Sequence, residues 1–117
     1  MNAVALLGRL TADPELRKAG KNKDAVSVVN YTLAVSRIGS EEADFIRCVA
    51  FGKTAEFMEQ YLNKGSRIAV TGRIQTGQYK DKAGNTVFTT EVITDRVDFA
   101  DGKAEDEDSG STRRRQR

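Results

Sequence analysis

Apolar and polar residues alternate along several stretches of this chain, which is the pattern of strands that bury one face. In residues 1–10, Val4, Leu6 and Leu10 fall on one side, while Leu7 and Arg9 fall on the other. The alternation recurs further along the chain. We therefore predict strands at residues 1–10, 15–18, 26–37, 44–51, 67–75 and 87–99.

The strand at residues 26–37 is rich in β-branched side chains, which favour extended backbone. Tyr31, Leu33 and Val35 share one of its faces. The alternation slips at Val28-Val29, where two large apolar residues are adjacent. This slip indicates a β-bulge.

Turn residues separate the predicted strands. Asp13-Pro14 ends the first one, because proline holds the preceding residue extended and has no N–H to donate. Residues 19–24 and 38–43 are polar loops. A long hairpin covers residues 78–99 and turns at residues 81–85.

One helix is predicted, at residues 54–63. Ala55, Met58 and Leu62 recur at helical spacing, so they define its buried side. Thr54 has the side chain of an N-cap, and Gly65 follows the helix as a stop signal. We expect Phe57 and Tyr61, one turn apart, to pack as core residues.

Apart from the short segment at residues 15–18, the order of elements is three strands, a helix and two strands. This is the arrangement of an OB-fold, a closed five-stranded all-β barrel with its helix between strands three and four. We expect one domain over residues 1–101. Residues 102–117 lack large apolar side chains and are predicted to be a disordered charged tail, acidic over 105–108 and arginine-rich at its end.

The strand at residues 44–51 has two contrasting faces. Phe45, Arg47 and Phe51 point to one side, and the small apolar Cys48 and Ala50 point to the core. Exposed rings beside fixed cations suit a ligand that is both flat and anionic. Single-stranded nucleic acid has these properties, because its bases stack and its phosphates carry charge. The alternative interpretation is that the rings pack at a protein contact.

Composition limits the chemistry that is available. The chain has 117 residues, a net charge of +2, one cysteine and no histidine. No internal disulfide can form, the usual general base and zinc ligand is absent, and no apolar run approaches a membrane span. Gly52-Lys53-Thr54 resembles the end of a phosphate loop, but Arg47 stands where that loop needs glycine. We expect no enzyme activity, no metal, no cofactor and no membrane association.

Five ordered motifs connect the chain to a known family. They are GRLTADPELR (8–17), NYTLAVSR (30–37), DFIRCVAFGKTAE (44–56), YLNKGSRIAVTGRIQT (61–76) and YKDKAGNTVFTTEV (79–92). Together they resemble bacterial single-stranded DNA-binding proteins over about residues 1–100. The resemblance implies a cytoplasmic, nucleoid-associated OB-fold protein without cofactor. Such proteins usually form homotetramers and coat single-stranded DNA in replication, recombination and repair.

The resemblance also implies particular contacts with DNA. Three aromatic residues match family positions that stack on bases: Phe45, Phe51 and Tyr79. The cations in or beside matching motifs are Arg9, Arg17, Arg37, Arg47, Lys53 and Arg73, with Lys80 and Lys82 on the hairpin. Tyr31 and Phe88 either line the binding groove or fill the barrel. The outward strip of Ala3, Ala5 and Leu7 suits a subunit contact.

The chain departs from the family pattern in two places. The family often has an aromatic residue in the loop after the second strand, whereas Ile38-Gly39-Ser40 has none. Family tails typically end in an acidic, apolar tip that recruits replication proteins, whereas this chain ends in STRRRQR. We therefore expect no tail-mediated recruitment. The main alternative function is an OB-fold adaptor or replication accessory subunit that contacts protein.

Overall fold

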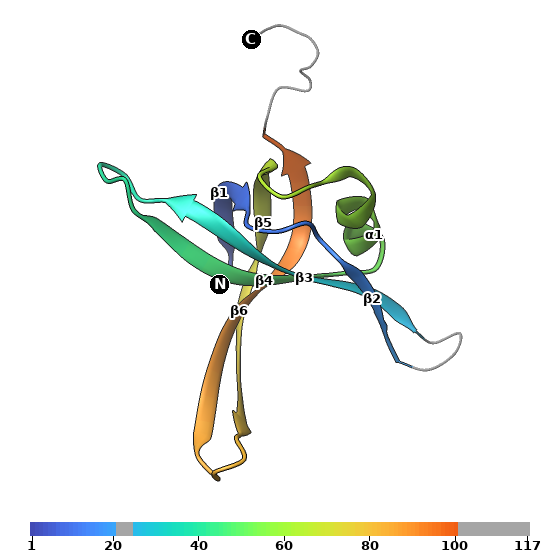
Figure 1. Ribbon diagram of the computed structural model, residues 1–117, viewed down its shortest axis with the longest axis vertical. Helices are drawn as coiled ribbons and strands as arrows, with labels where there is room; N and C mark the ends of the chain where they lie inside the picture. Colours follow the sequence, from blue (N-terminus) through green and yellow to red (C-terminus); the bar gives the residue numbers. More distant parts are fainter. Residues whose placement is uncertain (21–24, 101–117) are drawn as a thin grey trace, which may run out of the picture.

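The computed structural model describes residues 1–20 and 25–100. Its elements are β1 (Val4–Leu10), β2 (Leu16–Ala19), β3 (Val26–Ser36), β4 (Ala43–Phe51), α1 (Gly52–Tyr61), β5 (Arg67–Lys80) and β6 (Thr86–Phe99). The strands form one sheet in the order β1-β5-β6-β4-β3-β2, and β1 also pairs with β3. This extra pairing closes five strands into a ring, so the predicted OB-fold barrel is confirmed (Figure 1). The predicted tail at residues 102–117 lies outside the described residues.

The first strand of the barrel is interrupted. At the end of β1, the Leu10 N–H donates to the Ser66 carbonyl at 3.0 Å, and the Leu10 carbonyl accepts from the Gly65 N–H at 2.8 Å. Pro14 is buried between β1 and β2, where its missing N–H breaks the ladder. Pairing with β3 resumes in β2. The two segments together act as one bent barrel strand.

The core fills the barrel and continues beneath the helix. Its fully enclosed side chains include Leu33, Ile68 and Val70 from the strands and Met58 from α1. Cys48 also lies in this core, as its alternation predicted. Burial raises the pKa of the Cys48 thiol to about 11, so at neutral pH it is a protonated, small apolar group.

Tyr31 fills the barrel, which decides between its two predicted positions. Its ring is buried, and its hydroxyl shares a hydrogen bond with the Thr94 hydroxyl of β6. Burial raises the pKa of the Tyr31 phenol, so this group stays neutral. The bond joins β3 to β6 across the barrel interior.

A second, smaller cluster lies on the opposite face of the sheet. Val28, Val49 and Ile93 are buried there, contributed by β3, β4 and β6. This cluster shows why the predicted bulge at Val28-Val29 is wrong. The two side chains point to opposite faces and each meets an apolar cluster, while the β3–β4 register runs without a break. The observed register shift lies in the β5–β6 pair, where Asp95 is the extra residue.

The helix begins earlier than predicted. The chain passes from β4 into α1 at Gly52, whose φ of 63° favours glycine. Phe51 occupies the N-cap without a side-chain hydrogen bond, so the prediction of Thr54 as N-cap is wrong. The predicted buried side is correct, since Ala55 and Met58 are enclosed. No helix within residues 1–20 and 25–100 is long and apolar enough to cross a membrane.

The two helix aromatics behave differently. Phe57 packs against the core, and its ring centroid lies 5.3 Å from that of Tyr61 and 5.6 Å from that of Phe99. Tyr61 itself is exposed, so its prediction as a core residue is wrong. It lies on the solvent side of this small aromatic cluster.

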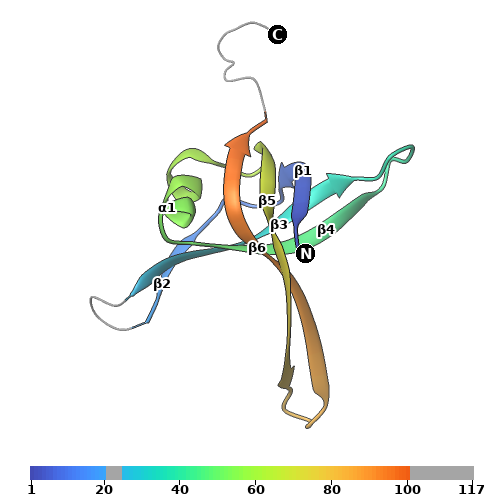
Figure 2. The ribbon, with the colours of Figure 1, turned by 180° about the vertical axis from the view of Figure 1, so that it is seen from behind.

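The strands β5 and β6 extend well beyond the barrel as a two-stranded arm (Figures 1 and 2). β5 runs unbroken to Lys80, five residues past its predicted end. The turn at residues 81–85 is as predicted: the Asp81 N–H donates to the Asn85 carbonyl at 2.9 Å. Ile74 lies on the core side of the sheet, as predicted, but it is 45% exposed because the barrel ends there.

Candidate nucleic-acid interface

The pairing registers bring most of the predicted residues onto one side of the sheet. Directly paired residues share a face. Phe45 pairs with Ala34 on β3, which in turn pairs with Arg9 on β1. The same surface, called the outer face below, carries these residues: Arg9, Arg17, Phe45, Arg47, Phe51 and Arg73.

Two rings dominate the outer face. Phe45 is 68% exposed and Phe51 is 46% exposed, with Arg47 between them on β4. Six residues of strand separate the rings, which corresponds to roughly 20 Å at about 3.3 Å per residue. The two rings therefore meet different nucleotides of any bound strand. Arg47 lies where it can reach the backbone between them.

The small apolar cluster of Val28, Val49 and Ile93 lies on this same face, between the rings and cations. Phe51 pairs with Val28, and Arg73 pairs with Ile93. The cluster fixes the backbones of three strands relative to one another. The rings and cations are thus presented from a packed base rather than from a loop.

Three arginines of the outer face, and Lys53 beside it on α1, have no carboxylate partner among the described residues. Within residues 1–20 and 25–100, no salt bridge engages Arg17, Arg47, Lys53 or Arg73. With the Asn30 side-chain amide oriented so that its oxygen faces Arg17, that oxygen accepts hydrogen bonds from Arg17 Nη2 and Nε at 3.0 and 3.1 Å. That neutral partner orients the guanidinium without cancelling its charge. Lys53 is exposed in the first turn of α1, two residues after Phe51.

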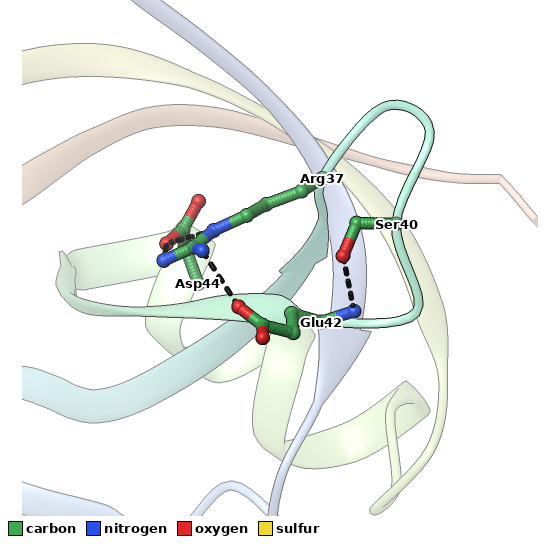
Figure 3. A network of polar contacts seen from close by, with 4 residues as sticks. All are labelled: Arg37, Ser40, Glu42 and Asp44. Carbon is green, nitrogen blue, oxygen red and sulfur yellow. Dashed lines mark hydrogen bonds and ion pairs between the residues drawn. The ribbon is translucent and has the colours of Figure 1, made fainter.

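Arg37 differs from these cations. Its guanidinium donates to Asp44 Oδ1 from Nη2 at 2.8 Å and to Glu42 Oε1 from Nη1 at 2.8 Å (Figure 3). The hydrogen bond from Arg37 lowers the pKa of the Asp44 carboxyl, and both groups are exposed. The guanidinium that was predicted to contact a phosphate is thus paired with two carboxylates. The Glu42 N–H also donates to Ser40 Oγ at 3.0 Å, which orders the loop.

A polar hollow of about 270 Å³ opens beside Arg47. Asn30, Thr32 and Glu91 line it, and the buried Tyr31 and Cys48 contribute to its wall. Asn30 and Thr32 were not singled out from the sequence. The alternation of residues 26–37 does indicate that both side chains point outward, because they fall on the face opposite the core-facing Tyr31 and Leu33.

The hairpin residues divide between the two faces of the arm. Tyr79 is 56% exposed and lies on the continuation of the outer face, in line with Arg73 on β5. Lys80, the next residue, points to the reverse side, and Lys82 lies in the turn. The structure therefore brings Tyr79, but not Lys80, onto the same side as the rings of β4.

The described chain offers no metal centre, since no group of three or more His, Cys, Asp or Glu residues is arranged to hold an ion within residues 1–20 and 25–100. Glu42 and Asp44 are instead paired with Arg37. What the outer face presents is exposed rings and arginine side chains.

Comparisons with known proteins identify the family of the chain. Residues 1–100 match the Single-strand binding protein family. A Single-stranded DNA-binding protein of Clostridium perfringens is 50% identical over 102 residues, which cover 86% of this chain and 67% of that protein. The protein of the same name in Halalkalibacterium halodurans is 46% identical over 116 residues, covering 95% and 67%, respectively. In Staphylococcus aureus, Single-stranded DNA-binding protein 1 is 44% identical over 112 residues, covering 92% and 70%. The chain therefore belongs to the single-strand binding protein family.

Proposed function

We propose that this protein binds and coats single-stranded DNA with little sequence preference, in replication, recombination and repair. The observation that carries the proposal is the outer face, where the exposed rings of Phe45 and Phe51 flank Arg47 on one strand. Membership of the single-strand binding protein family supports it. In this role the protein acts at the nucleoid, in the cytoplasm.

The physical mechanism is binding without catalysis. Every base has a π-face, so stacking on Phe45, Phe51 and Tyr79 does not depend on base identity. The phosphates pair with Arg47 and its neighbouring cations, which releases counterions and makes the affinity depend on salt. Duplex DNA binds less well, because its bases are already stacked and paired. Neither cofactor nor metal takes part.

The binding domain comprises residues 1–101, and we propose that it assembles as a homotetramer, a dimer of dimers. Ala5 and Leu7 are exposed on the outer side of β1. Between Val4 and Gly8, β1 pairs with β5 but not with β3 in the described register. An apolar strand with an open edge is suited to pairing with a second copy. Sedimentation at micromolar concentration tests this assembly, and a monomer there contradicts it.

The test of DNA binding uses Phe45→Ala and Phe51→Ala with a fluorescent oligo-dT. Loss of one stacking contact costs roughly 1–3 kcal/mol, so each variant should bind about 5-fold to 150-fold more weakly. Tyr61→Ala is the matched control, because it removes an exposed ring on α1, away from the outer face. We expect its affinity to be unchanged.

The same experiment separates the DNA-binding function from an adaptor function. If the rings of β4 serve a protein contact, both phenylalanine variants bind oligo-dT as the parent does. Unaltered affinity in both variants therefore refutes the proposal. Circular dichroism of each variant shows that the barrel is intact, as expected for changes at exposed side chains.

A further inference from the structure

The reverse side of the β5–β6 arm carries the most exposed aromatic ring of the protein. Phe88 is 76% exposed, more than Phe45 at 68% or Tyr79 at 56%. It pairs directly with Gln78, whereas Tyr79 pairs with Val87. Successive residues of a strand point to opposite sides, so Phe88 and Tyr79 lie on opposite faces of the arm. The side that carries Phe88 is called the reverse face below.

The neighbours of Phe88 repeat the chemistry of the outer face. By register, Lys80 shares its side, together with uncharged polar residues and one aliphatic residue. The members of the reverse face are Ile74, Thr76, Gln78, Lys80, Thr86, Phe88 and Thr90. None of them is acidic, and Glu91 lies on the other side with Gln75. The reverse face therefore combines a ring, a cation and hydrogen-bond donors without an opposing carboxylate.

The reverse face is also shaped to receive a ligand. A hollow of about 530 Å³ lies along it, and its lining includes Thr76, Gln78, Phe88 and Thr90. The reverse face continues from the barrel interior past the rim, where Ile74 becomes exposed. A two-stranded ribbon has no second layer to cover such side chains.

Resting on the DNA-binding function proposed above, we propose that the reverse face binds a further segment of the same DNA strand. A base stacks on Phe88, and a phosphate pairs with Lys80. The two strands of the arm lie about 5 Å apart, so the ribbon is narrow. A strand that leaves Tyr79 can pass around the edge of the arm and reach Phe88 within a few nucleotides. Long strands then contact both faces of the arm, while short ones contact the outer face alone.

The direct test uses tryptophan as a reporter of stacking. The chain has no tryptophan, so Phe88→Trp introduces a single one. We expect its emission to be quenched by a long oligo-dT, and to change little with one of about 10 nucleotides, which one barrel can accommodate. Tyr79→Trp is the control for the outer face and should be quenched by both lengths. Tyr61→Trp, on α1, should respond to neither.

Affinity provides an independent readout. Phe88→Ala should weaken binding of the long oligo-dT at least about fivefold, as loss of one stacked base implies, and should leave the short one unaffected. It should also reduce the number of nucleotides occupied per protein at saturation. Tyr61→Ala is the control, because it removes an exposed ring on α1, away from the arm, and it should leave the binding of both lengths unchanged.

The outcomes distinguish this proposal from the function on which it rests. If the long oligo-dT quenches Tyr79→Trp but not Phe88→Trp, the reverse-face proposal is refuted and DNA binding by the outer face stands. If neither is quenched, both proposals fail. If Phe88→Ala lowers the mass of the DNA-free protein in sedimentation, a second copy covers Phe88, and the reverse-face proposal is again overturned.

Discussion

Removal of the Arg47 charge should change how DNA affinity responds to salt. Three outer-face arginines, Arg17, Arg47 and Arg73, and Lys53 at the start of α1 make no salt bridge within residues 1–20 and 25–100. For single strands, each phosphate contact adds about −0.7 to the slope of log affinity against log salt. Four contacts predict a slope of about −2.8, hence an affinity loss of about 50-fold between 50 and 200 mM salt. Arg47→Gln should reduce the slope to about −2.1 and the loss to about 20-fold.

The assay is titration of a short fluorescent oligo-dT at several salt concentrations, read by anisotropy. A short oligonucleotide limits each complex to one outer face, so that the count of contacts applies. Phe51→Ala tests the contribution of stacking. It should weaken binding by roughly 1–3 kcal/mol at every salt concentration and leave the slope unchanged, because stacking releases no counterions.

Arg37→Gln is the matched control among the arginines. It is exposed like Arg47, but Glu42 and Asp44 already hold its guanidinium. We expect its slope to stay close to that of the parent. Equal reduction of the slope by Arg37→Gln and Arg47→Gln would show that the salt bridges do not divert Arg37 from DNA. An unchanged slope for Arg47→Gln would refute its role as a phosphate contact.

Three further predictions concern the scaffold. Gly72→Ala should lower the free energy of unfolding, measured in urea, by about 1–3 kcal/mol, because its new Cβ would overlap the Ile93 carbonyl oxygen. Gly77→Ala should lower it less, because the nearest atom to the new Cβ is Thr89 Oγ1 at 3.1 Å. Met58→Ala should cost about 2–5 kcal/mol in the same measurement, because its side chain is fully enclosed beneath α1; a loss below 1 kcal/mol would contradict this. The Cys48 thiol should react slowly with a disulfide reagent in the native protein and quickly in urea. Since burial raises its pKa from 9.0 to about 11, stability should fall as the pH rises from about 9 towards 11, and Cys48→Ala should reduce that dependence.

The sequence was sufficient for much of the fold because the barrel strands bury one face. The alternation at Val4, Leu6 and Leu10 predicts which side of β1 meets the core, and the structure agrees. The pattern was misleading at Val28-Val29, where both faces are buried. A run that is apolar on both sides resembles a bulge in sequence, and only the position of Ile93 in a distant strand distinguishes the two.

In the candidate site, too, some features follow from the sequence of one strand and others depend on the tertiary structure. Phe45, Arg47 and Phe51 were found from their strand alone, because local alternation decides their direction. The pairing of Arg37 with Asp44 was not predicted, because it depends on the geometry of the β3–β4 turn. The exposure of Phe88 does not follow from its own strand for a related reason: it depends on where the barrel ends and the arm begins.

The cluster of Val28, Val49 and Ile93 gives the outer face a foundation that is separate from the barrel interior. Substitutions of the neighbouring rings and cations, such as Phe51 beside Val28, can alter the cover of this cluster, but they do not reach the barrel interior. The affinity of the outer face for a ligand can therefore be changed while the packing of the barrel interior is kept. This separation makes the outer face a favourable starting point for engineering variants with altered affinity.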